Sequence, residues 1–241
     1  MTTNVRDTGY APDRWAFDDE VTRVFDDMLR RSIPDLEAMR RLVVDVAAPF
    51  VRPLTAIVDL GCSRGESLAP LVDRFSTANT YLGVEIADPM LAATRSRFAP
   101  LIERGVVTVE RRDLRESFPD VSASVVLAVL TLVFVPINYR QRIIRDAYRA
   151  LRPGGAFVLV EKVLARGANL DAVYVDAYHA FKRENGYTAD DVERKRLALE
   201  GVQVPLTVAE NERMLRDAGF SEVDTFWRYL NFAGLVAVKG S

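Results

Sequence analysis

Residues 55–65, with the sequence TAIVDLGCSRG, constrain the fold of this chain more than any other stretch. A short apolar run ends there in Asp59, and a turn containing Gly61 and Gly65 follows. The next residues, 66–75, have the pattern of a helix. A strand that runs into a glycine turn and then into a helix brings backbone N–H groups close to a ligand. The stretch therefore predicts a site for a nucleoside-bearing cofactor, without indicating which reaction follows.

Strand and helix patterns alternate from this point on. In chain order we expect strands at 56–60, 81–86, 106–111, 124–132 and 156–161, and helices at 66–75, 88–103 and 139–151. Such alternation favours parallel pairing with right-handed crossovers. The last two strand patterns, 222–229 and 232–239, are close in sequence and predict an antiparallel hairpin. We therefore expect a seven-stranded, doubly wound, Rossmann-like α/β sheet, mostly parallel with one antiparallel edge strand.

Two helical segments lie outside this alternation. Residues 15–52 are expected to form an N-terminal helical flank over the cofactor side, beginning at a helix that Asp18 can cap. Residues 165–200 are expected to form a helical insertion that caps an acceptor. Residues 1–14 are polar and are expected to be a loose arm. We expect all of residues 1–241 to form one domain.

Bulk properties exclude several classes of function. A length of 241 residues suits one domain, and a net charge of −2 gives no overall attraction to nucleic acid or to an anionic membrane. The single cysteine and single histidine make a disulfide framework and a zinc site poor candidates. We see neither a signal peptide nor an apolar run of membrane-spanning length. We therefore expect a cytoplasmic protein without a metal.

Two acids follow the next two strands. Glu85 lies about two dozen residues beyond Gly61, where dinucleotide-binding folds place the acid that holds the ribose hydroxyls. Asp113 ends the third strand and could accept a hydrogen bond from an adenine amino group. The alternatives are a surface acid at a strand end for Glu85 and an arginine-paired loop acid for Asp113. Cys62 fits a small packing residue better than a nucleophile, because no histidine is near it in sequence.

Together these features resemble a class I S-adenosylmethionine (SAM)-dependent methyltransferase. Within that superfamily the sequence is most similar to the carboxy-S-adenosylmethionine synthases, and the likeness covers residues 15–239. Ser63, where most methyltransferases have a middle glycine, is part of it. The stretches that carry it are residues 17–18, 24–28, 31–34, 59–65, 161–162, 181–187, 195–196 and 231–232.

The resemblance implies an activity and partners. Members of this family carboxylate the methyl group of SAM, with prephenate as the carboxyl source. Their product then feeds the modification of a tRNA wobble uridine by a partner enzyme. The resemblance implies SAM or carboxy-SAM as cofactor, a small-molecule substrate and a homodimer. We expect no direct contact with nucleic acid or membrane.

The resemblance also implies site residues. It assigns Arg196 to the added carboxylate, and a guanidinium suits a carboxylate because it binds both oxygens. Two positions depart from the family: Leu36 stands where the family has a cofactor-contacting Tyr, and Val129 stands where it has an Asn. The implied cofactor-binding residues are Gly61, Cys62 and Ser63 in the turn, Glu85 and Ile86 at the ribose and adenine, and Asp113 and Leu114 at the adenine edge, with Asp59 and Gly65 in the same motif.

A basic cluster with interleaved aromatic residues lies in the insertion. Its members are Lys182, Arg183, Arg194, Lys195 and Arg196, with Tyr174, Tyr178, Phe181 and Tyr187. For most of them we expect a solvated helix face over packed aromatic rings; Arg196 is the exception. His179 could be a general base toward an acceptor, although a packed or solvent-facing histidine is the stronger interpretation. Tyr178 is a weaker candidate for the same role.

Three functions remain open. The first is methyl transfer to a small acceptor, which could bear a carboxylate that Arg196 holds. The second is carboxy-SAM synthesis, and the third is a non-catalytic SAM-binding protein. We rank methyl transfer slightly first, because Leu36 and Val129 replace polar residues at positions that contact the ligand.

Overall fold

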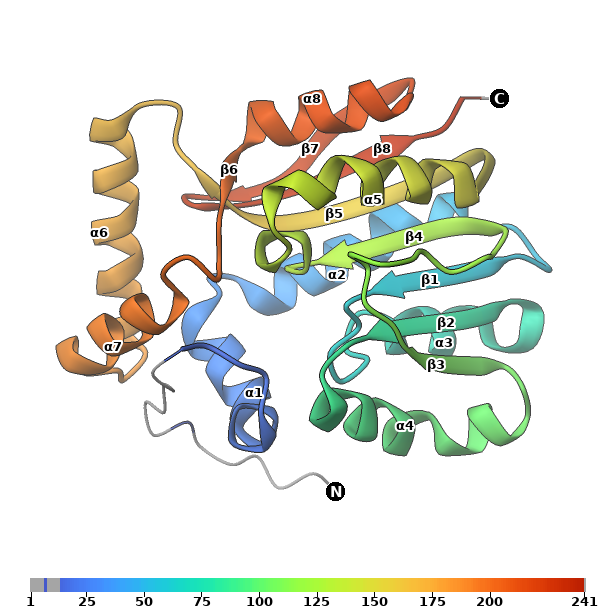
Figure 1. Cartoon of the computed structure of the whole chain (residues 1–241), viewed down its shortest axis with the longest axis horizontal. Helices are drawn as coiled ribbons and strands as arrows, with labels where there is room; N and C mark the ends of the chain where they lie inside the picture. Colours follow the sequence, from blue (N-terminus) through green and yellow to red (C-terminus); the bar gives the residue numbers. More distant parts are fainter. Residues whose placement is uncertain (1–6, 8–13, 241) are drawn as a thin grey trace.

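A sheet of eight strands forms the centre of the computed structural model, which describes residue 7 and residues 14–240 (Figure 1). The strand order is β3-β2-β1-β4-β5-β8-β7, and the short β6 pairs with β5 outside this path. The expected arm falls mostly on residues that are not described. The strands are β1 (Ala56–Leu60), β2 (Thr80–Glu85), β3 (Val107–Arg111), β4 (Ala123–Val129), β5 (Leu151–Leu164), β6 (Leu206–Thr207), β7 (Glu222–Tyr229) and β8 (Phe232–Val238).

The first five strands are parallel, as the alternating pattern predicts. The expectation of an antiparallel edge strand is wrong. β8 is antiparallel to both of its neighbours and lies inside the sheet, between β5 and β7. The hairpin joins the sheet through its second strand, so β7 forms the edge. The eighth strand is β6, whose two residues pair with the extended end of β5 at Val163 and Leu164.

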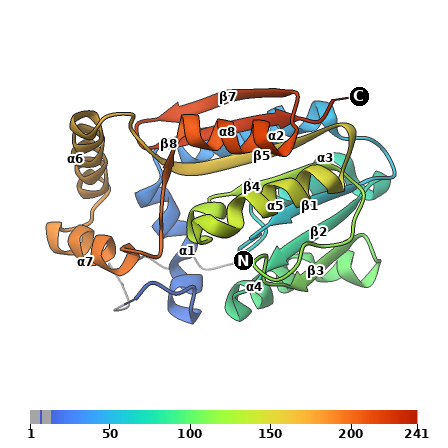
Figure 2. The same cartoon turned by 45° about the horizontal axis from the view of Figure 1, so that its top comes forward.

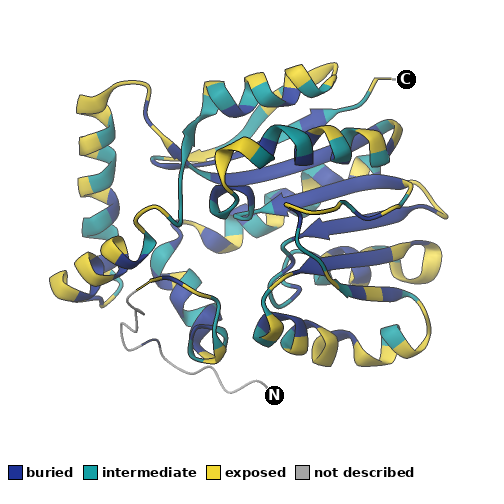
Figure 3. Cartoon of the chain, viewed as in Figure 1, coloured by how far each residue is buried: buried dark blue, intermediate teal, exposed yellow. Residues whose placement is uncertain are grey.

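Helices cover both faces of the sheet (Figure 2). On one face, α5 (Ile137–Ala150) and α8 (Val208–Ala218) bury Ile143, Ile144 and Leu215 against Val58 and Val126. On the other face, apolar side chains of three helices meet strand residues such as Ile57 and Val125, which alternate with those of the first set. These helices are α2 (Leu36–Ala47), α3 (Ala69–Phe75) and α4 (Asp88–Glu103). The central strands β1, β2 and β4 are almost entirely buried, whereas the edge strands β3 and β7 are partly exposed (Figure 3).

The remaining helices lie together beyond the carboxyl ends of β1 and β4 (Figure 1). They are α1 (Asp19–Ser32), α6 (Ala168–Glu184) and α7 (Ala189–Leu199), and α6 contacts both of the others. The Asp18 side chain caps α1 by accepting from the Val21 N–H at 2.8 Å, as expected. The N-terminal flank and the insertion therefore meet at the end of the sheet where parallel α/β folds bind ligands. No described helix is long and apolar enough to cross a membrane.

Asp7 departs from the expected loose arm. Its side chain is fully buried and lies 2.9 Å from the Lys195 Nζ of α7. The Tyr187 hydroxyl also donates a hydrogen bond to it. At this residue the chain is therefore held by the insertion, 180 residues away in sequence.

Candidate functional site

The turn after β1 has three residues in the left-handed region: Gly61 (φ 69°), Ser63 (φ 48°) and Gly65 (φ 79°). A side chain at Gly61 would also collide with Thr131, because a Cβ built there lies 2.4 Å from the Thr131 Cγ2. The Gly61 and Cys62 N–H groups donate to the Val84 carbonyl at 2.8 and 3.0 Å. The turn is thus fastened to the end of β2, and glycine is required where it passes Thr131.

The helix after the turn begins later than expected, at Ala69 instead of residue 66. The Ser63 N–H donates to Glu85 and the Gly65 N–H to the Cys62 carbonyl, so four of the five N–H groups of residues 61–65 are satisfied within the chain. Backbone N–H groups of this turn were expected to lie close to a ligand, but these four already have acceptors within the chain. Three of these donors, the N–H groups of Gly61, Cys62 and Ser63, bind the turn to the end of β2.

Glu85 is held in place by the backbone around it. Its carboxylate accepts from the Ser63 N–H at 2.9 Å, the Ile86 N–H at 2.7 Å and the Ala87 N–H at 3.0 Å. The residue is buried yet lines a cavity. A carboxylate has about four acceptor positions, so one remains for a ligand hydroxyl. This geometry suits the ribose-binding role better than a free surface acid.

Two cavities meet at the carboxyl ends of the strands. Both are bounded by Gly61, Ser63, Leu130 and the rings of Phe17 and Phe134. The outer cavity has an empty volume of about 990 Å³ including its mouth, and Glu85, Ile86, Asp113 and Leu114 line it. The inner cavity, of about 1020 Å³, is lined by Leu36, Cys62, Glu66, Val129, Lys162, Tyr178, Lys182, Lys195 and Phe232, among others.

Asp113 is paired with an arginine, as one of the two interpretations expects, and it also lines the outer cavity. Its carboxylate accepts two hydrogen bonds from the Arg115 guanidinium at 2.6 and 2.9 Å. The hydrogen-bonded Arg115 side chain lowers the pKa of this carboxyl. Asp113 is therefore an ionised acceptor held beside the neighbouring Leu114, which is buried. Ile86 is 42% exposed and offers an apolar surface near the same cavity.

Asp59 lies beneath the turn and lines neither cavity. It is fully buried, and its Oδ2 has no hydrogen-bond partner in the described part of the chain. Burial, and then the negative charges of Glu66 and Glu85, raise its pKa to about 8. A cation bound beside this cluster would offset the repulsion among the three acids and favour the ionised form of Asp59. SAM carries a sulfonium and an ammonium, so the residues present fit this cofactor.

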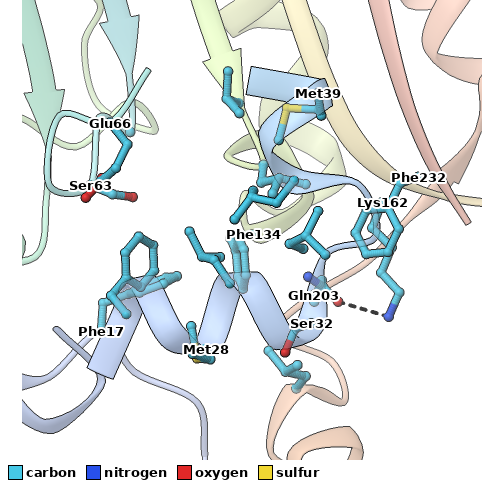
Figure 4. Close-up of a pocket in the computed structure, with 18 of the residues that line it drawn as sticks. Phe17, Met28, Ser32, Met39, Ser63, Glu66, Phe134, Lys162, Gln203 and Phe232 are labelled. Carbon is cyan, nitrogen blue, oxygen red and sulfur yellow. Dashed lines mark hydrogen bonds between the residues drawn. The ribbon is translucent and has the colours of Figure 1, made fainter. Parts of the chain in front are cut away.

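The opposite side of the inner cavity is positive. Figure 4 shows Ser63 and Glu66 on one side and Lys162, hydrogen-bonded to Gln203 at 3.2 Å, on the other. We call Lys162, Lys182 and Lys195 the lysine wall. Lys182 and Lys195 are buried and Lys162 is half-buried. Burial, and then the neighbouring Lys162 and Lys195, lower the pKa of Lys182 to about 7.

The lysine wall corrects the sequence interpretation of the insertion. Lys182 and Lys195 were expected on a solvated helix face, but both line the inner cavity, while Arg183 and Arg194 are exposed. Lys162 was not singled out as a site residue. A signal did exist: Tyr178 and Lys182 are four residues apart in α6, and this spacing places them on one face of a helix.

Two expected catalytic residues lie away from the cavities. The Arg196 side chain is 45% exposed, and its guanidinium pairs with Glu193 at 2.8 Å and with Glu200 at 3.7 Å. His179 is half-buried and lines neither cavity, because it follows Tyr178 and so faces another direction on α6. Burial, and then nearby lysines, lower its pKa. The third candidate, Tyr178, does line the inner cavity, and burial raises the pKa of its hydroxyl.

Aromatic rings that the sequence did not indicate form the partition between the cavities. Trp15, Phe17 and Phe134 line both. Phe17 packs edge to face with Trp15 at 6.2 Å and with Phe134 at 5.2 Å between ring centroids. Glu161 shapes the loop that carries Phe134, because its buried carboxylate accepts from the Leu132 N–H at 2.9 Å. β4 therefore ends at Val129 instead of residue 132.

In the described part of the chain, no group of three or more His, Cys, Asp or Glu side chains could hold a metal ion.

Known proteins are similar to this chain in sequence and in fold. Residues 57–155 match the family model described as a methyltransferase domain. The carboxy-S-adenosyl-L-methionine synthase of Methylococcus capsulatus is 40% identical over 228 residues, which is 94% of each chain. That of Staphylococcus epidermidis is 32% identical over 95% of this chain and 99% of the relative.

Solved structures show the same fold at low identity. An O-methyltransferase family protein from Burkholderia thailandensis superposes with a TM-score of 0.68 at 19% identity, over 93% of this chain and 61% of that chain. Human N-acetylserotonin methyltransferase in complex with SAM superposes with a TM-score of 0.62 at 15% identity, over 92% of this chain and 56% of that chain. The full-length matches, the doubly wound fold and the SAM-compatible site lead to one conclusion: the chain belongs to the carboxy-S-adenosyl-L-methionine synthase family and is a SAM-dependent transferase.

Proposed function

We propose that the protein synthesises carboxy-SAM by transferring a carboxyl group from an anionic small-molecule donor to the methyl group of SAM. The observation that carries the proposal is the lysine wall, which faces the acidic side of the same cavity. Lysines there suit a carboxylate-bearing donor and a carboxylated product. A methyl acceptor without a carboxylate would need no such wall.

In this proposal acidic residues bind the cofactor and lysines bind the carboxyl donor. SAM supplies a methyl carbon activated by the adjacent sulfonium. Glu85 and Asp113 would hold the ribose and adenine, and the charge of Glu66 favours the positively charged part of the ligand. The lysine wall would hold the donor across the cavity from the turn, and this positioning supplies much of the rate. The aromatic partition keeps water from the reacting groups.

The overall exchange conserves atoms and charge. One carbon–carbon bond to the carboxyl group breaks in the donor, and one forms at the methyl carbon. One methyl hydrogen leaves as a proton. With prephenate as donor, the ring becomes aromatic as it loses the carboxyl group and the ring hydroxide, and that hydroxide takes up the proton as water. Prephenate is the donor that the family resemblance implies, and it carries the negative charge that the lysine wall calls for.

Incubation with SAM and prephenate, followed by mass spectrometry, tests the proposal. We expect a SAM-derived product heavier by one carboxyl group. The matched control omits prephenate and should leave SAM unchanged. If SAM binds but no carboxylated product forms with prephenate, carboxy-SAM synthesis from this donor is ruled out.

Methyl transfer to a small acceptor is the second candidate. Leu36 and Val129 both line the inner cavity and present apolar surface where the family has polar groups. That surface favours an acceptor with an apolar body. Conversion of SAM to S-adenosylhomocysteine in the presence of such an acceptor, without carboxy-SAM, would favour this candidate. The sequence alone ranks methyl transfer first, and the lysine wall reverses that order.

The remaining assignments belong to the same proposal. Residues 1–241 act as one domain in the cytoplasm, as a homodimer, on small molecules and without direct contact with nucleic acid. The net charge of −2 supports the absence of nucleic-acid binding. Size-exclusion chromatography with light scattering tests the dimer.

A further inference from the structure

The three members of the lysine wall differ in their counterions. Lys195 is neutralised by Asp7 at 2.9 Å. Neither Lys162 nor Lys182 forms an ion pair with any carboxylate in the described part of the chain. Lys162 donates one hydrogen bond, to the neutral Gln203, and Asp171 acts on it only at longer range. Two ammonium groups of the inner cavity therefore lack a close negative partner.

These two ammonium groups converge on one aromatic ring. The Lys162 Nζ lies 5.2 Å and the Lys182 Nζ 5.0 Å from the centroid of the Tyr178 ring. Lys162 comes from β5, while Lys182 and Tyr178 come from α6. Tyr178 is itself fixed edge to face against Phe232 at 5.4 Å. Two separate elements thus bring positively charged groups close to the same aromatic ring.

This arrangement works against folding. Burial lowers the pKa of both lysines, and for Lys182 the charge of Lys162 adds to the effect. Cation–π contact with one ring compensates only part of such a cost. Buried charges are ordinarily paired. A ligand that brings the missing negative charge accounts for the pair, whereas packing does not.

We propose that Lys162 and Lys182 together bind the two carboxylates of a dianionic carboxyl donor, whose apolar part lies against Leu36, Val129 and Phe232. All five residues line the inner cavity. Two uncompensated cations match two negative charges, and the apolar residues match a hydrocarbon body. The assignment rests on the proposed function, because it concerns the donor of that reaction. In this assignment Lys162 and Lys182 bind the donor. Arg196 does not, because its side chain is exposed and paired with Glu193.

The first test measures donor binding without turnover. S-adenosylhomocysteine lacks the transferable methyl group, so calorimetric titration of the protein–S-adenosylhomocysteine complex with prephenate reports binding alone. We expect Lys162→Met and Lys182→Met each to raise the prephenate Kd about tenfold or more, as for loss of a buried charged contact. The S-adenosylhomocysteine Kd should stay within about twofold, since neither lysine is on the adenine side.

Arg183→Met is the matched control. It removes the next positive charge along α6, but Arg183 is exposed and lines neither cavity. Its prephenate Kd should equal that of the wild type. Equal prephenate affinity in the wild type and both lysine variants would overturn the assignment. A rise of the prephenate Kd in Arg183→Met as large as that in the lysine variants would also overturn it, because it would show a general effect of charge.

A second measurement needs no variant. Benzylmalonate is a stable dianion with an apolar ring, and its monomethyl ester carries one charge fewer. In the wild-type complex with S-adenosylhomocysteine we expect the dianion to compete with prephenate at least about tenfold better than the ester. Equal competition by the two compounds would contradict a site for two carboxylates.

The two proposals can fail separately. If prephenate binds through both lysines but no carboxy-SAM forms, the dianion site stands and the proposed reaction falls. If carboxy-SAM forms equally well in the wild type and in both lysine variants, the reaction stands and the dianion site falls.

Discussion

The two sides of the joined cavities are built in opposite ways. The acidic side comes from the turn after β1 and the end of β2, and its residues lie within 30 positions of one another in the sequence. There Glu85 has three backbone donors and is fully organised before any ligand arrives. The lysine side comes from β5, α6 and α7, and two of its three ammonium groups lack a counterion.

The difference shows how one fold separates two tasks. On the cofactor side, Glu85 and four of the five N–H groups of the turn have hydrogen-bond partners within the chain. The lysine side is built from β5 and the insertion, and it carries unpaired positive charge at a cost in stability. A site that is incomplete alone is completed by its ligand.

Glu85→Ala should have the largest effect. The change removes the ligand acceptor and leaves the Ser63, Ile86 and Ala87 N–H groups without their partner. Hydrogen bonds to a charged group contribute about 1.5–3 kcal/mol each, so we expect the SAM Kd to rise about 100-fold by calorimetry. Glu103→Ala, at the exposed end of α4, is the control. A change below threefold at Glu85 would remove it from the cofactor site.

Donor affinity should fall as the pH rises above 7. The pKa of Lys182 is lowered to about 7 by burial, Lys162 and Lys195, against the opposing charge of Asp7. The dianion binds the protonated amine, so deprotonation above pH 7 removes one of its two charged contacts, while His179 is already neutral there. We expect the prephenate Kd to rise about tenfold between pH 6 and 8.5.

Lys182→Arg provides the control for this pH dependence, because a guanidinium keeps its charge over the whole range. The variant should lose most of the pH dependence while still binding the donor. A profile as steep as that of the wild type would show that another group titrates.

Arg196→Ala should have a smaller effect. Its guanidinium pairs with Glu193 and Glu200 on the exposed face of α7. We expect the prephenate Kd to change by about twofold to threefold, as for a screened surface charge. A loss as large as that of Lys182→Met would instead place Arg196 against the ligand in the working enzyme, through a movement of α7 or from a second copy of the chain.

Lys182→Met should slightly stabilise the ligand-free protein. The native state holds Lys182 with a lowered pKa, so the cost of its charge is complete below pH 7 and disappears as the pH approaches the ordinary lysine value. Removing about 1 kcal/mol of that cost would raise Tm by about 2–4 °C for a chain of this size. The gain, measured by calorimetric melting, should be larger at pH 6 than at pH 9. A lower Tm would indicate that Lys182 supports the fold.

Much of the cofactor side was predictable from the sequence. Gly61, Glu85 and Asp113 each follow a strand of a parallel sheet, and parallel strands bring their carboxyl ends to one edge. The left-handed turn and the acids at the strand ends are encoded locally, so their positions followed from the alternating pattern. The start of α3 and the end of β4 were missed because they depend on bonds to β2 and to Glu161.

The sequence by itself therefore determined the doubly wound sheet, the turn and the acids of the cofactor side, because these depend on short-range periodicity and strand order. Only the tertiary structure decided which insertion residues face the ligand. Lys162, Lys182 and Lys195 come from three elements whose approach is set by packing of α1, α6 and α7. For that reason two adjacent cations differ in their surroundings: Lys195 is buried and pairs with Asp7, whereas Arg196 is exposed and pairs with Glu193.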